Sequence, residues 1–146
     1  MTGVQTCALP IFIGGIVGGI LYFGLGYLVY GNLLMNFLKD HPGTATGVDR
    51  AMADFEFLYL TIGNFAHGFL LAYIFVKGNV NSLANGLITG GIVGLLMSVG
   101  INSIMYGVSN ITSKTAMAAD VAAFTVISAI VGAIVGMIMG MGKKTA

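Results

Sequence analysis

The side chain best placed to do acid–base chemistry inside an apolar stretch of this sequence is His67. It lies near the middle of residues 57–76, and Asn64 precedes it by three positions, which is nearly the same face of a helix. A membrane interior penalises charge, so an ionisable group at that depth marks a candidate functional site.

A second row of polar side chains continues this pattern on residues 83–106. It consists of Ser98, Asn102 and Tyr106, spaced four apart. Counted from the ends that carry the acidic loops, Asn64 and Ser98 fall at similar depths, and Asp120 lies at the rim. We therefore predict a polar funnel that opens on the acidic side. A hydrogen-bond chain in it would run through His67, Asn64, Ser98 and Asn102. The candidate site comprises His67, Asn64, Ser98, Asn102 and Tyr106.

Three interpretations of His67 remain open. A neutral imidazole can bond a backbone carbonyl or Asn102 across a helix pair, which contributes about 0.6 kcal/mol on average. It can also serve a solute or proton site. A metal or haem site is the third, but the other histidine, His41, lies beside Pro42 in a polar connection, and no carboxylate or cysteine completes a ligand set at that depth. We predict no metal and no cofactor.

Other chemistry is not indicated by the sequence. Nucleophile–base pairs and paired carboxylates do not occur in the sequence. Phosphate-binding loops are not indicated either, because the glycines lie inside apolar runs without strand–turn context. Glu56 and Asp120 are interpreted as acids that begin helices, where the dipole favours them. The net charge of +1 provides no basic field for nucleic acid. The protein is predicted not to be an enzyme and not to bind nucleic acid.

The elements that must position these residues are four long apolar segments. The chain is 57% hydrophobic and 8% charged, whereas soluble domains carry about 25% charged residues, so a lipid-facing exterior is expected. Each segment holds roughly 20 or more residues, enough for about 30 Å of helix. We predict an all-α bundle of four transmembrane helices, at about residues 12–37, 57–76, 83–106 and 116–141.

The connections are polar and give the topology. Pro42 and Gly43 end the first helix, and Asp49 is a plausible N-cap that starts the second helix before residue 57. Four spans place both chain ends on one side. The basic residues divide equally, with Lys77, Lys143 and Lys144 on the side of the chain ends, so the positive-inside rule gives little guidance. We expect a multi-pass membrane protein with cytoplasmic termini.

An internal repeat links the first and third segments. The sequence Gly-Gly-Ile-Val-Gly at 14–18 returns at 90–94, and Tyr30-Gly31 returns as Tyr106-Gly107. Because each half contains two helices, both halves keep the same orientation in a membrane. The repeat predicts two parallel helical hairpins. Where the copies differ, Tyr22 stands against Ser98 and Gly26 against Asn102.

Glycines spaced four apart follow three of the segments. Small residues at this spacing let helices approach closely, which matters in lipid because no hydrophobic drive acts between helices. Residues 57–76 carry bulky aromatics instead, so they are expected to supply knobs or to face lipid. The predicted packing glycines are Gly14, Gly18, Gly86, Gly90, Gly94, Gly132, Gly136 and Gly140.

Residues 1–11 resemble the translation of a common sequencing adapter and are set aside from the fold. The expected domain is therefore 12–144, and Cys7, the single cysteine, lies outside it.

Four short spans, a glycine-rich first segment ending in Tyr30-Gly31, and asparagines in the next two segments resemble a class of small uncharacterised bacterial integral membrane proteins, grouped as a domain of unknown function. The resemblance covers 12–144 and implies a four-helix fold in a bacterial envelope, without a substrate. We expect a structural or accessory protein that self-associates through its glycine faces, in contact with the bilayer and with a copy of itself or a membrane protein partner. The alternative is a transporter or channel for a small solute or proton, with a path near His67 and Asn102.

Overall fold

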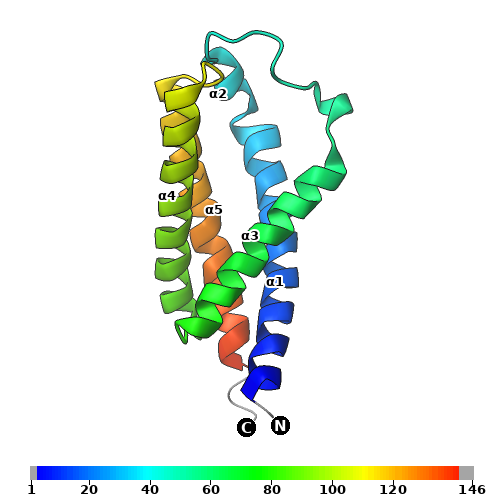
Figure 1. The fold of residues 1–146 in the computed structure, drawn as a ribbon, viewed down its shortest axis with the longest axis vertical. Coiled ribbons are helices and arrows are strands. Elements are labelled where there is room, and N and C mark those ends of the chain that lie inside the picture. Colours follow the sequence, from blue (N-terminus) through cyan, green and yellow to red (C-terminus); the bar gives the residue numbers. More distant parts are fainter. Residues whose placement is uncertain (1–2, 142–146) are drawn as a thin grey trace.

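The structure is a computed structural model that describes residues 3–141, and these residues form helices joined by loops (Figure 1). No strand occurs in this part of the chain, where Pro42 and Thr112 form an isolated bridge. The long helices contain four candidate membrane spans, which confirms the predicted all-α class with four spans. Lys143, Lys144 and the predicted domain end at 144 lie outside the described residues. In chain order the helical elements are α1 (Gly3–Leu28), a π-helical turn (Val29–Leu33), α2 (Met35–Asp40), a 3-10 turn (Met52–Asp54), α3 (Phe57–Lys77), α4 (Leu83–Val108) and α5 (Lys114–Met141).

The first helix departs from its predicted limits of 12–37. It begins at Gly3, so the adapter-like residues continue α1, and it widens into the π-helical turn before α2. The turn is closed by the Leu34 amide, which donates to the Val29 carbonyl at 2.7 Å, a five-residue hydrogen bond. The predicted single helix is therefore a long helix, a π turn and a short helix.

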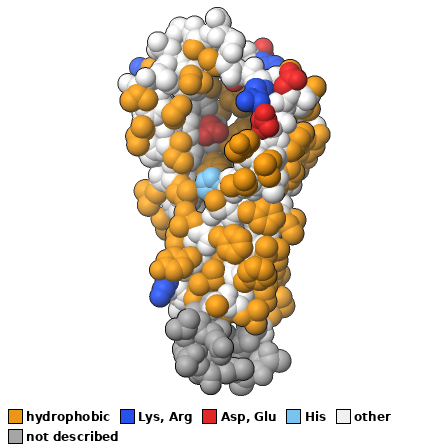
Figure 2. Space-filling view, turned by 45° about the vertical axis from the view of Figure 1, so that its right-hand side comes forward, with side chains coloured by type: hydrophobic (Ala, Val, Ile, Leu, Met, Phe, Trp, Pro, Cys, Tyr) orange, Lys and Arg blue, Asp and Glu red, His pale blue; other side chains and the backbone are white. Residues whose placement is uncertain are grey.

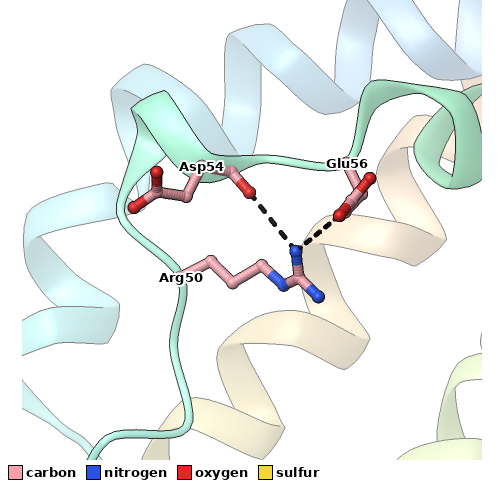
Figure 3. A network of polar contacts seen from close by, with 3 residues as sticks. All are labelled: Arg50, Asp54 and Glu56. Atoms are coloured by element: carbon pink, nitrogen blue, oxygen red, sulfur yellow. Dashed lines mark hydrogen bonds and ion pairs between the residues drawn. The ribbon is translucent and has the colours of Figure 1, made fainter.

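The start of the second predicted helix also differs. Asp49 is not an N-cap, because residues 41–56 form a loop with one 3-10 turn and α3 begins at Phe57. Arg50 organises this loop, since its Nη1 atom lies 2.9 Å from Glu56 Oε1 and 3.5 Å from the Asp54 carbonyl (Figure 3). Side-chain contacts inside the loop thus replace the capping interaction.

The long helices form two antiparallel pairs, α1 with α3 and α4 with α5. Helix α1 also packs on α5, whereas α3 barely touches α4 or α5. Figure 1 shows why: α3 crosses α1 diagonally, so its N-terminal half diverges from α4 and α5 near the long loop. The start of α1 and the end of α5 lie together at the opposite end.

Helices α4 and α5 meet along a seam of glycines. A Cβ atom added at Gly136 would lie 2.6 Å from the Ser82 carbonyl oxygen, and one at Gly90 would lie 2.9 Å from the Gly132 Cα. Gly86 faces Gly132 in the same way, backbone against backbone. Of the predicted packing glycines, those of α4 and α5 therefore form contacts within one chain.

Helix α1 meets α3 differently. A Cβ at Gly18 would lie 3.1 Å from the Gly68 Cα, where the two helices cross. Beside this point the ring of Phe65 covers Gly19 and the ring of Phe69 covers Gly15. Helix α3 thus supplies aromatic knobs, as its bulky sequence indicates.

The buried core lies towards the end where the chain starts and finishes. Its fully or nearly buried members are Tyr22, Leu71, Phe75, Ile127, Val131 and Val135. The outer faces of the spans carry exposed apolar side chains, including Leu58, Leu96 and Ile104, each at least 65% exposed. Such a surface is suited to lipid.

Candidate functional site

A carboxylate in α5 gathers polar side chains from two other parts of the chain. The Asn102 Nδ2 atom of α4 donates to Asp120 Oδ2 at 2.6 Å, and the Ser98 Oγ lies 3.5 Å from the same oxygen. Tyr30, in the π-helical turn after α1, is also hydrogen-bonded to Asp120. The half-buried carboxylate is therefore held by hydrogen-bond donors alone.

The glycine row of α4 explains how these donors are positioned. Ser98 and Asn102 follow Gly94 at the same spacing of four, so the face that packs on α5 becomes polar near the loops. Asn102 Nδ2 also lies 3.0 Å from the Ser98 carbonyl and 3.2 Å from Ser98 Oγ, which fixes the amide. Ser98 is only 4% exposed. The close contact of α4 with α5 at the preceding glycines therefore brings the side chains of Ser98 and Asn102 onto Asp120.

Asp120 has no basic partner among the described residues. The ion pair found in the described part of the chain, Arg50–Glu56, lies on the loop surface, and both of its side chains are more than half exposed. Asp120 is six residues into α5, roughly 11 Å from the middle of that helix at 1.5 Å per residue. In a hydrocarbon layer about 30 Å thick and centred on α5, the carboxylate would lie within the layer.

One turn further from the loops, His67 belongs to an aromatic layer. Its ring lies edge-on to Phe124, with centroids 5.3 Å apart, and 5.9 Å from the ring of Tyr22. Tyr22 in turn stacks on Phe124 at 5.8 Å. Asp120, Phe124 and Ser128 are spaced four apart, so α5 places the carboxylate and the aromatic layer on one face.

Below this layer the path between the helices is closed. The Tyr22 hydroxyl donates to Ser128 Oγ at 3.0 Å, and both residues are buried. Val131 and Val135 follow on α5 with no exposed surface. Polar groups therefore occupy the loop-side half of the bundle, and apolar packing seals the other half.

The loop-side half is hollowed on the face where α3 diverges. Figure 2 shows a recess with an acidic side chain inside it and a histidine side chain nearer the middle of the bundle. Charged side chains gather at the end of the molecule above the recess. An acidic side chain is thus reachable from outside on this lateral face.

A strap of loop covers part of this end. The Ala45 amide donates to the Asn110 carbonyl at 3.0 Å, and the Ser113 hydroxyl donates to the His41 carbonyl at 2.7 Å. Between the strap and the α4–α5 connection is a polar cleft of about 310 Å³, which Tyr106 and Lys114 help to line.

The five predicted polar residues do not form one cluster. Ser98 and Asn102 meet at Asp120, whereas Tyr106 lines the loop cleft and His67 lies in the aromatic layer. Asn64 donates to the Leu60 carbonyl of its own helix at 2.7 Å. The predicted chain through Asn64 is therefore wrong.

The interpretation of Asp120 as an acid that only begins a helix was incomplete. Its carboxylate bonds side chains from neighbouring elements, six residues inside α5, rather than the first-turn amides. The sequence pattern singled out Tyr22 as a difference between the repeat copies and Tyr30 as a repeated residue, but it joined neither to Asp120, and it missed Phe124 and Ser128 as parts of the site. Their spacing of four, Tyr22 to Tyr30 through Gly26 and Asp120 to Ser128 through Phe124, was the signal available.

Metal ligands do not gather in the described part of the chain: no three of His, Cys, Asp and Glu approach closely enough to hold an ion. No protein-family model, curated protein or solved structure matches this chain. Functional conclusions therefore depend on the geometry of the site.

Proposed function

We propose that this chain is a multi-pass membrane protein that binds a proton or small monovalent cation at Asp120 and takes part in its transport. The observation that carries the proposal is the half-buried Asp120 carboxylate, inside a candidate span and held by hydrogen-bond donors, with no basic partner in the described part of the chain. An acid within a bilayer is costly and is typical of ion and proton pathways.

The surrounding donors suit a reversible binding site. Asn102, Ser98 and Tyr30 stabilise the ionised carboxylate, so the site can exist without a bound cation. A proton or cation arriving through the recess would neutralise the charge and reduce the cost of burial. Asp120 is thus the binding group, and the three donors are positioning residues.

A single chain provides only half of a path, because Tyr22, Ser128 and the core below them close the bundle. Transport therefore needs either rearrangement of this layer or a second copy of the chain. The packing glycines of α4 and α5 are already occupied, so association would use the lipid-facing surfaces of α3 and α4. We place the protein in a bacterial inner membrane, with its termini in the cytoplasm.

A structural or accessory role is the second candidate. Its support is the weak contact of α3 with α4, which leaves apolar faces free for a membrane partner. In that role Asp120 would serve packing alone, and its charge would not matter to ion movement.

Ion flux separates these functions. Purified protein in liposomes, with a pH dye or a sodium dye inside, should show ion entry driven by a potential. Asp120→Asn should reduce the flux by about tenfold or more, because it removes the charged binding group while keeping its shape. Asp54→Asn, at an exposed loop acid on the same side, is the control and should retain the flux. Equal fluxes in wild type and Asp120→Asn would refute the proposal.

A further inference from the structure

We infer that the ion bound at Asp120 is a proton and that His67 is its next acceptor, receiving it on Nε2. This inference rests on the function proposed above and names its substrate. It assigns a transport role to a side chain that forms no hydrogen bond with Asp120 or with its donors.

The hydrogen bond of His67 fixes which nitrogen is available. Its Nδ1 atom lies 2.9 Å from the Gly63 carbonyl oxygen. A carbonyl oxygen can only accept, so Nδ1 carries a hydrogen. In the neutral ring Nε2 then carries a lone pair and is a proton acceptor.

The Nε2 atom is also accessible. Nδ1 is the ring nitrogen of His67 that forms a hydrogen bond among the described residues. No fully buried side-chain nitrogen or oxygen in that part of the chain lacks a partner, so Nε2 retains exposed surface. This matches the recess of Figure 2, where a histidine side chain is visible from outside.

The two stations together select a proton over a metal cation. Sodium is a hard cation that requires several converging oxygen ligands, whereas Asn102 presents its Nδ2 hydrogens to Asp120. The next polar group inward is an imidazole nitrogen, a poor ligand for hard cations and an effective proton acceptor. Of the proton and sodium, the proton is therefore the ion that can occupy the carboxylate and then the imidazole.

Phe124 lies between the two stations. Phe124 lies one turn from Asp120 on the same face of α5, and its ring centroid is 5.3 Å from that of His67. One turn rises about 5.4 Å, so transfer from Asp120 past Phe124 to Nε2 proceeds through bridging water. The proton leaves the Asp120 carboxyl oxygen, which becomes a carboxylate, and binds Nε2, which makes the ring an imidazolium. The hydrogen on Nδ1 remains hydrogen-bonded to the Gly63 carbonyl oxygen throughout.

The charges around His67 favour this transfer. Helix α1 presents the Tyr22 phenol to the ring, and α5 presents Phe124, with Asp120 above it. Helix α4 contributes only neutral groups to this region, Ser98 and Asn102. Asp120 is therefore the one acid that can balance an imidazolium, and moving the proton creates a pair of opposite charges rather than an isolated charge.

A matched histidine control exists in the same chain. His41 makes the same bond as His67, from Nδ1 to the Phe37 carbonyl four residues earlier at 2.9 Å, but it lies at the loop end. In proteoliposomes, His67→Gln should lower proton flux by about tenfold, as expected for loss of a proton-transfer group, whereas His41→Gln should retain it. Sodium flux should be absent from all variants.

The outcomes separate the two claims. Loss of flux in Asp120→Asn with full proton flux in His67→Gln, or sodium flux in wild type, overturns this inference and leaves the proposed function standing. No ion flux in wild type, or full flux in Asp120→Asn, overturns both.

A second measurement covers the case in which His67→Gln fails to fold. In the His41→Gln background His67 is the single histidine, so ¹⁵N-histidine solid-state NMR reports on it alone. Nδ1 should remain protonated, and Nε2 should gain a proton on acidification, at a pH that changes in Asp120→Asn. An Nε2 that stays unprotonated on acidification, or one indifferent to Asp120→Asn, overturns the inference.

Discussion

The two helical pairs of this protein are closed by different means. Helices α4 and α5 lie backbone against backbone along a row of glycines, whereas α1 and α3 cross near Gly68 and then diverge. The first arrangement makes a rigid wall, and the second opens a recess beside it. A polar site needs both, because the wall holds the ligands of Asp120 and the divergence gives access to it.

The repeated Gly-Gly-Ile-Val-Gly sequence shows how the same residues produce these two results. In α4, Gly90 and Gly94 face the backbone and side chain of Ser128. In α1, Gly15 lies under the ring of Phe69, and Gly14 faces side chains of both α5 and α3. The partner helix decides the outcome, since α3 meets the α1 backbone at Gly68, with aromatic rings beside that point, whereas glycine and serine let α5 approach α4 over several turns.

The largest expected effect is the loss of the α4–α5 wall. Gly136→Ile places a branched side chain where even a Cβ would lie 2.6 Å from the Ser82 carbonyl oxygen. Overpacking of this kind costs about 3 kcal/mol or more, so thermal unfolding in detergent should occur at a much lower temperature. Gly100→Ile is the control on α4, with no atom within 4 Å of its Cβ position. Similar melting of both variants would contradict the difference drawn between the faces.

A smaller effect is expected at the site that the wall holds. Asn102→Leu removes the closest donor to Asp120, and leaving a buried carboxylate short of a partner costs about 1–3 kcal/mol. The double variant with Asp120→Leu should recover part of this loss, because the unpaired acid is then absent. A double-mutant cycle in denaturant measures the coupling, and additive losses would mean that the pair does not interact. Asn64→Leu, which loses only a bond to its own helix, serves as the comparison.

The smallest effect is expected where α1 and α3 cross. Gly18→Ala brings a Cβ to 3.1 Å from the Gly68 Cα, so the crossing must widen slightly. Alanine regains up to about 1 kcal/mol of helix propensity, and the net loss should stay below about 1 kcal/mol. Gly63→Ala, with open space around its Cβ position, should be neutral or stabilising. A loss at Gly18 as large as that of Gly136→Ile would show that the two pairs are equally tight.

The sequence predicts much of the fold because the apolar runs end abruptly. Helices α4 and α5 begin and end, and helix α3 ends, within about two residues of their predicted limits, where Lys77, Ser109 and Lys114 interrupt the runs. The break after α1 was missed, because the π-helical turn lies in an apolar stretch with no proline to mark it.

The site was predicted in part, for a physical reason. Ser98, Asn102 and His67 stand out as polar residues in apolar runs. Their partners depend on which helix faces which, and the contact of Gly86 with Gly132 that sets the α4–α5 register is not encoded in spacing along one helix. Asp120 near a helix start also has a sufficient local explanation, so its role emerged only from its neighbours in space.

The most direct test of the central claim, that Asp120 reversibly binds a cation within the bundle, is infrared difference spectroscopy of the protein in lipid during a pH change. A carboxyl band should appear on acidification, vanish in Asp120→Asn and persist in Asp54→Asn. If the titrating band were identical in wild type and Asp120→Asn, and added sodium also left the two spectra alike, Asp120 would not be the binding group.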